Sequence, residues 1–192
     1  AVSFILGPRI NATGRMDSPD ISLRLLLTQD QEEAQHLVEL MEGFNKNRQQ
    51  VEGKILDEAR EMIGRRVNFK NEHVIVVAKE DWHLGVLGIV ASKIADHFYR
   101  PAIVISIGEG VCKGSARSIK NFHLFDALED CKDHLDTFGG HSHAAGLKIA
   151  RENIDNFRAS INKVAFERIK GEDLLPAIEV DAQVALHELN EP

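Results

Sequence analysis

The sequence has little of what marks secreted or membrane-spanning proteins. Its 192 residues contain only two cysteines, Cys112 and Cys131, which lie far apart without CxxC spacing. Neither a disulfide framework nor a zinc ribbon is therefore indicated. No apolar run approaches the length that spans a bilayer, and no charged-then-apolar leader is present. We therefore expect a soluble, cytoplasmic protein with no membrane partner.

Positive charge is also scarce. The formal net charge of −7 argues against a protein that coats nucleic acid through bulk electrostatics. It does not exclude a local basic site, because residues 100–120 carry four basic side chains and one acidic one. At 43% hydrophobic residues, the chain can bury one good core, or one core with an extended appendage.

Both ends of the sequence resemble internal segments of a protein. The chain begins at Ala1 inside an apolar stretch, without a methionine. Near the other end, residues 178–184 alternate between apolar and polar side chains, as a strand does, with no partner strand after them. We therefore expect a piece of a larger protein.

The first third of the sequence predicts a glycine- and arginine-containing loop followed by helices. In residues 7–17, two arginines flank an Asn-Ala-Thr-Gly stretch, which indicates a loop that contacts an anion or, alternatively, a surface loop with solvated arginines. A short helix then runs through Leu27. From Asp30 to Ile63 apolar residues recur every three or four positions, which predicts a helix of about 50 Å. We interpret it as a connector between two domains, or else as a dimeric helical seam.

From His73 onward the pattern is mixed α and β. Short β-branched or alternating runs predict strands at 74–78, 101–106, 111–118 and 145–149, and amphipathic runs predict helices at 82–95, 122–133 and 153–169. The predicted fold class is α/β, with the long helix followed by a mixed-sheet domain.

Three segments of this domain are candidates for binding an anion. Residues 114–118 end a predicted strand with a glycine, two hydroxyls and an arginine, which are groups that donate to and neutralise phosphate. Residues 137–147 predict a loop in which Gly139 and Gly140 allow close backbone approach and His141 can reach a ligand. Trp82 and His83 start a helix, where an anion is favoured, although core packing of a lone tryptophan is commoner.

Four motifs in order resemble the RecJ family of the Asp-His-His (DHH) phosphoesterase superfamily. They are RINATGR (residues 9–15), WHLGVLGIVAS (82–92), GSARS (114–118) and GGHSHAAG (139–146). The resemblance implies a single-strand-specific 5′→3′ DNA exonuclease, with the tail of a metal-binding domain at 1–18 and a helical connector at 19–67. It further implies a DHH-associated α/β domain at 68–170 and the start of an oligonucleotide-binding β-barrel at 175–192.

The resemblance also implies how the chemistry is divided. Mn²⁺ or Mg²⁺ would be bound by a missing N-terminal domain and would activate water, since no Asp-His-His triplet lies in these residues. His141 would act as the catalytic residue here by hydrogen-bonding the reacting phosphate. Ser115, Arg117 and Ser118 would grip the phosphate of the single-stranded DNA, and Gly139 and Gly140 would donate backbone amides. Arg15, with Asn11 and Arg9 as further possibilities, would hold the DNA near its 5′ end. Possible partners among repair proteins are not identifiable, and no metal ligand is expected here.

Other interpretations remain open. A DHH-family oligoribonuclease or cyclic-dinucleotide phosphodiesterase would share the histidine loop. A different class of protein would be a non-catalytic module that binds single strands or a partner protein through its long helix. A metal site formed by histidines at 83, 123, 141 and 143 is disfavoured, because the one-residue spacing of the last two suits chelation poorly.

Overall fold

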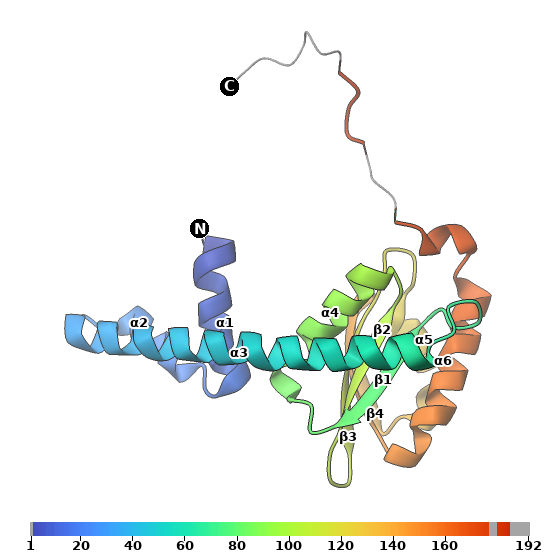
Figure 1. Cartoon of the computed structure of the whole chain (residues 1–192), viewed down its shortest axis with the longest axis horizontal. Helices are drawn as coiled ribbons and strands as arrows, with labels where there is room; N and C mark the ends of the chain where they lie inside the picture. The colour runs from blue at the N-terminus through green and yellow to red at the C-terminus, as the bar shows by residue number, and fades with distance from the viewer. Residues whose placement is uncertain (1, 177–179, 185–192) are drawn as a thin grey trace.

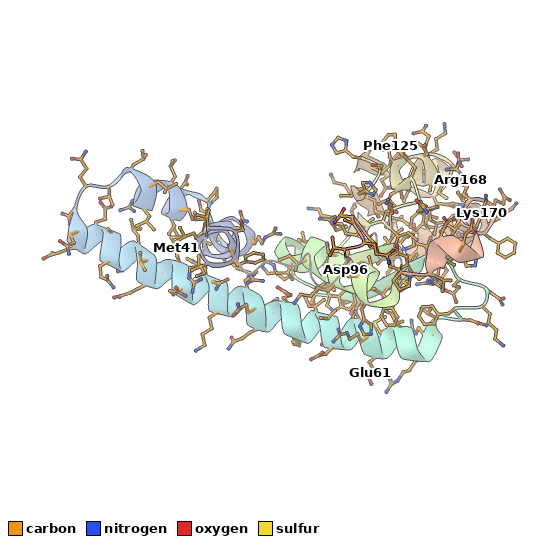
Figure 2. The ribbon with its side chains drawn as sticks, turned by 90° about the horizontal axis from the view of Figure 1, so that it is seen from above. Met41, Glu61, Asp96, Phe125, Arg168 and Lys170 are labelled. Atoms are coloured by element: carbon orange, nitrogen blue, oxygen red, sulfur yellow. The ribbon has the colours of Figure 1, made fainter. Side chains whose placement is uncertain are left out.

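The protein has a helical arm and an α/β domain, joined by one long helix (Figure 1). A computed structural model describes residues 2–176 and 180–184. Within these residues, no helix is long and apolar enough to cross a membrane. Figure 2 shows the layers from above: Glu61 on the long helix and Phe125 mark the two outer sides of the α/β domain, with Asp96 between them.

The arm consists of α1 (Gly7–Met16), α2 (Asp20–Leu27) and the first half of α3 (Gln31–Arg66). The predicted long helix is confirmed, and its 36 residues correspond to about 54 Å. Its N-cap residue is Asp30, whose side chain accepts hydrogen bonds from the backbone N–H groups of Glu32 and Glu33 at 2.8 and 3.0 Å.

The prediction of a loop for residues 7–17 is wrong, because this segment is α1. Pro8 lies in the first turn, where a missing N–H costs nothing, and Arg15 lies in the last turn, where the helix dipole favours a cation. Ala12 and Thr13 are buried, and the Thr13 hydroxyl lies 2.8 Å from that of Ser22 on α2. Packing against the other helices of the arm therefore favours the helix over a flexible loop.

The α/β domain is built on a five-stranded mixed sheet of order β1-β2-β3-β5-β4. Its strands are β1 (Ile75–Glu80), β2 (Ala102–Ile107), β3 (Cys112–Arg117), β4 (Thr137–Gly140) and β5 (Ala144–Ile149). The β1–β2 pair is parallel and the other pairs are antiparallel. The predicted combination of a long helix and a mixed-sheet α/β domain is thus confirmed.

Each face of the sheet is packed against different helices. Ile75 and Val104 belong to the core formed with α3 and α4 (Leu87–Phe98), which follows a 3-10 turn, η2 (Leu84–Val86). Val76 and Ile103 belong to the core formed with α5 (Leu124–Glu129) and α6 (Ile154–Arg168). Because successive side chains of a strand point to opposite faces, β1 and β2 are apolar on both.

Polar side chains fix α3 against the rest of the domain. Glu52 on α3 is only 4% exposed and forms ion pairs with Arg48 and with Lys93 of α4. Trp82, also 4% exposed, donates from Nε1 to a carboxylate oxygen of Glu58 at 2.8 Å. Trp82 is therefore a core residue, as expected of a lone tryptophan, and its side chain does not line an anion site.

The described C-terminal residues neither confirm nor contradict the barrel start predicted at 175–192. A 3-10 turn at Gly171–Leu174 follows α6, and residues 175, 176 and 180–184 have no strand conformation. The remaining part of the alternating pattern at 178–184 lies outside the described residues. The start of a barrel at 175–192 stays a prediction.

Candidate functional site

Arg117 and Ser115 lie together on the face of β3 that α4 covers. The Arg117 guanidinium donates from Nη1 to the Ser115 hydroxyl oxygen at 3.3 Å and to the Ala116 carbonyl oxygen at 2.8 Å. It rests against Gly88 in the first turn of α4, where a Cβ atom would come within 2.9 Å of Nη2 and 3.2 Å of the serine oxygen. The absence of a side chain at Gly88 thus makes room for the guanidinium.

Arg15 approaches the same place from the arm. Its guanidinium donates from Nη1 to the carbonyl oxygen of Gly85 in η2 at 3.1 Å. A Cβ atom on Gly85 would lie 2.0 Å from the Arg15 carbonyl oxygen, so the end of α1 and η2 are in close contact. Burial, together with the nearby charge of Arg15, lowers the pKa of the Arg117 guanidinium. Two cations therefore lie close enough to repel each other, and a bound anion would relieve that repulsion.

Asn11 and Arg9, the other two polar candidates of residues 9–15, have different surroundings in the arm. Asn11 is exposed one helical turn before Arg15, so the two positions share a face of α1. Arg9 instead forms an ion pair with Glu42 of α3 and donates to the carbonyl oxygen of Ile5 at 2.7 Å. The structure thus aligns Asn11 with Arg15 and engages Arg9 within the arm.

The glycine–histidine segment is partly a strand, which corrects the prediction of a loop. Residues 137–140 form β4, an edge strand of the sheet, and only residues 141–143 form the turn to β5. Gly140 has φ of 151°, and a Cβ atom there would lie 2.3 Å from the Ala144 carbonyl oxygen. Glycine is therefore required at 140. His141 is exposed, and its backbone N–H donates to the Ala144 carbonyl oxygen at 2.8 Å.

The turn is held to the end of β3 and the start of α5. The Ser118 backbone N–H donates to the His143 carbonyl oxygen at 2.9 Å, and the Leu124 N–H donates to the Ser142 carbonyl oxygen at 2.9 Å. The Ser118 hydroxyl donates to the Phe122 carbonyl oxygen at 2.6 Å. Ser118 therefore supports the turn, and its hydroxyl would have to leave that bond before it could donate to a phosphate.

A row of small residues runs across the sheet from β4 through β5 to β3, the strand that carries Arg117. Ser115 is the register partner of Gly146, which in turn pairs with Gly139. Both glycines are exposed, and a Cβ atom on Gly139 would meet nothing within 4 Å. Register thus places Gly139 in the row of Ser115, on an open surface where a ligand can approach the backbone. Sequence reasoning did not identify Gly85 and Gly146 as parts of this site.

The histidines do not form a metal site among the described residues. The Nδ1 atom of His83 accepts a hydrogen bond from the Gly85 backbone N–H at 3.1 Å, and Nδ1 of His123 accepts one from the Asp126 N–H at 3.3 Å. Both rings therefore cap short helical segments. No group of three or more His, Cys, Asp or Glu side chains that could hold a metal occurs in residues 2–176 and 180–184. These residues do not fit a metal centre.

Comparisons with known proteins show which domain family this chain matches and which proteins it is similar to. Residues 71–167 match the DHHA1 domain model. The single-stranded-DNA-specific exonuclease RecJ of Bacillus subtilis is 45% identical over 94% of this chain and 23% of that protein. RecJ of Haemophilus influenzae is 35% identical over 98% of this chain and 34% of that protein. This chain therefore spans between about a quarter and a third of those relatives' length.

Solved structures give the same result for the fold. The crystal structure of RecJ from Thermus thermophilus in complex with Mn²⁺ superimposes with a TM-score of 0.77 at 34% identity, covering 86% of this chain and 24% of that one. The corresponding complex with Mg²⁺ also gives a TM-score of 0.77, covering 26% of that chain.

Proposed function

We propose that this chain, which belongs to the DHHA1 domain family, is the phosphate-binding part of a single-strand-specific 5′→3′ DNA exonuclease. The proposal rests on one observation: Arg15, Ser115 and Arg117 lie close together. Arg15 contacts Gly85 of η2, and the other two side chains lie against Gly88 of α4. Two guanidinium groups and a hydroxyl beside an open backbone surface suit a phosphate, and they carry no means of distinguishing bases. Relatives named as single-stranded-DNA-specific exonucleases support the choice of substrate.

Each candidate residue has a distinct role in this proposal. Arg15 and Arg117 neutralise a phosphate near the 5′ end of the strand, and the Ser115 hydroxyl donates to its oxygen. Asn11, one turn before Arg15, contacts the adjoining sugar or phosphate. Backbone amides of Gly139 and Gly140, together with the His141 ring, hydrogen-bond the phosphate that reacts. Ser118 assists if its hydroxyl turns from Phe122 toward the strand.

The rest of the enzyme lies outside this chain in the proposal. Residues 1–18 form the tail of a metal-binding domain, 19–67 the connector, 68–170 the DHHA1 domain, and 175 onward the start of an oligonucleotide-binding barrel. Mn²⁺ or Mg²⁺ is held by that preceding domain, and related structures containing either ion support the choice of metal. Because the described residues do not fit a metal centre, no step of the proposal passes through a metal bound here.

Salt dependence tests the phosphate contact at Arg117. In the complete protein without divalent metal, Arg117→Ala should weaken binding of 5′-phosphorylated single-stranded DNA. It should also reduce the slope of log K against log salt by about 0.7 for the lost phosphate contact. Arg168→Ala on α6, which removes the same charge beside Asp130, is the matched control. An unchanged slope for Arg117→Ala would contradict the proposed contact.

Product release tests the activity and the division of the chemistry. The complete protein with Mn²⁺ should release mononucleotides from 5′-phosphorylated single-stranded DNA, whereas this 192-residue chain alone should not. His141→Ala in the complete protein should lower turnover far more than it lowers DNA binding. Faster hydrolysis of RNA dinucleotides than of long single-stranded DNA would favour an oligoribonuclease instead. Cutting by the isolated chain would refute the proposed division.

A further inference from the structure

Two lysines lie opposite each other on the same face of the sheet as Ser115 and Arg117. Lys113 on β3 is the register partner of Lys148 on β5, and both are exposed. Directly opposed residues on antiparallel strands have Cβ atoms about 4.5–5.5 Å apart, and like charges there destabilise the sheet. The pair therefore carries a local energetic cost, which a bound anion would offset.

No acidic side chain of the described residues neutralises this pair. Lys79, Lys93 and Lys132 each form an ion pair with a glutamate, but neither Lys113 nor Lys148 forms one within the part of the chain that the structure describes. Asp136 is adjacent in the sheet, where its backbone N–H donates to the Lys148 carbonyl oxygen at 2.9 Å. Its carboxylate nevertheless forms no ion pair with either lysine. The two ammonium groups thus make a positive patch in a chain of net charge −7.

The patch continues the candidate phosphate site along the strand. Lys113 and Ser115 are two positions apart on β3, a step of about 6.6 Å, and alternation places both on one face. Across the sheet, strand register aligns Lys113 with Lys148 and Thr137. The next row on the same face consists of Ser115, Gly146 and Gly139. No side chain larger than that of serine stands in this second row. Because α4 covers β3 at Gly88, the open part of this row lies over β5 and β4, where Gly146 and Gly139 are exposed, and an extended anion can reach the lysines along that side.

We infer that Lys113 and Lys148 form a second anion subsite, which holds a phosphodiester group of the nucleic-acid strand whose terminal phosphate lies at Ser115 and Arg117. Lysine ammonium groups bind phosphate as point charges and do not require a planar, bidentate partner, so the subsite contacts the backbone without regard to sequence. The Thr137 hydroxyl supplies a neutral donor at the edge of the row. This inference rests on the proposed function and adds a direction to it, because the strand then runs over β5 and β4, beside β3, toward the β2–β3 hairpin.

Strand length separates the two subsites experimentally. The complete protein and its Lys113→Gln/Lys148→Gln variant would be titrated, without divalent metal, with thymidine 5′-monophosphate, which has no phosphodiester group, and with a 5′-phosphorylated thymidine dodecamer. We expect the mononucleotide to bind both proteins equally. The dodecamer should bind the variant more weakly, with a salt slope reduced by about 0.7–1.4, which corresponds to one or two phosphate contacts in a single strand. Lys163→Gln on α6, an exposed lysine on the opposite side of the sheet, is the matched control.

Each outcome distinguishes the inference from the proposed function. Unchanged dodecamer binding by the double variant would overturn the subsite, while weakened binding by Arg117→Ala in the same assay would leave the proposed function standing. Equal weakening for both ligands would also overturn it, because the lysines would then belong to the terminal phosphate site. If neither the lysine variant nor Arg117→Ala changed binding, both would fail. Restoration of the salt slope by Lys113→Arg/Lys148→Arg would support the subsite further.

Discussion

Arg15 and Gly85 are joined by a hydrogen bond across seventy residues of sequence, from the guanidinium Nη1 to the carbonyl oxygen at 3.1 Å. The bond connects the end of α1 to η2, the short turn that precedes α4. Because α4 packs on β2 and β3, this contact places Arg15 beside Arg117. The candidate phosphate site is thus formed between the arm and the α/β domain.

Gly85→Ala should loosen this contact and destabilise the protein. A Cβ atom would lie 2.0 Å from the Arg15 carbonyl oxygen, so α1 or η2 must move. We expect a loss of about 1–3 kcal/mol in the free energy of unfolding, as in other overpacked contacts, measured by urea denaturation. Gly53→Ala on α3, where nothing lies within 4 Å, should instead stabilise the protein by about 0.5–1 kcal/mol. Equal stability of the two variants would contradict the close contact.

Gly88→Ala should weaken anion binding with little effect on stability. The new methyl group would come within 2.9 Å of Arg117 Nη2, which is the far end of a flexible side chain and can move away. We expect the affinity for 5′-phosphorylated single-stranded DNA to fall several-fold, measured by fluorescence anisotropy, while the melting temperature stays close to that of the parent. Gly64→Ala, in open space on α3, controls for the glycine-to-alanine change itself. Parental affinity in Gly88→Ala would show that the guanidinium position is unimportant for binding.

The two glycines before His141 should respond differently to substitution. Gly140→Ala forces a side chain into φ of 151° and within 2.3 Å of the Ala144 carbonyl oxygen, so the β4–β5 turn should rearrange and stability should fall. Gly139→Ala meets nothing within 4 Å and should fold normally, while its methyl group covers the open backbone surface beside Gly146. Thermal unfolding and DNA binding, measured on both variants, should therefore separate the structural glycine from the ligand-facing one. A stable Gly140→Ala protein would be the contrary result.

Glu58 should contribute a pH-dependent part of the stability. A hydrogen bond from Trp82, followed by one from Lys79, lowers the pKa of Glu58 below its ordinary value of 4.5. A lowered pKa in the folded state means that the stabilisation is present above pH 4.5 and is lost as the pH falls through the folded-state pKa. The melting temperature of Glu58→Gln should therefore lie below that of the parent at neutral pH, and the difference should shrink between about pH 5 and pH 3.

Glu167→Gln, an exposed change on α6, provides the comparison for that experiment. The difference in melting temperature between Glu167→Gln and the parent should not shrink with falling pH as the difference for Glu58→Gln does. A constant difference between Glu58→Gln and the parent across the acid range would contradict the inferred role of the carboxylate.

Local pattern alone predicted much of the fold. The three- and four-residue recurrence of apolar side chains predicted α3, because a helix needs no distant partner to align its own face. The β-branched run before Lys79 predicted β1, since a strand covered on both faces is apolar throughout. For the site, the composition of residues 114–118 singled out Ser115 and Arg117 as candidates. The order of four motifs indicated a DHH-associated domain, and residues 71–167 match the DHHA1 domain model.

Tertiary structure decided what local pattern could not, because the deciding contacts join residues far apart in the chain. Residues 7–16 became a helix through packing of Ala12 and Thr13 in the arm, although their composition indicated a loop. Strand register set Lys113 opposite Lys148 and aligned Ser115 with two exposed glycines. Sequence by itself thus indicated Arg15, Ser115 and Arg117 as candidates for binding phosphate, whereas docking of α1 on η2 and pairing of β3, β5 and β4 decided which side chains lie on one surface.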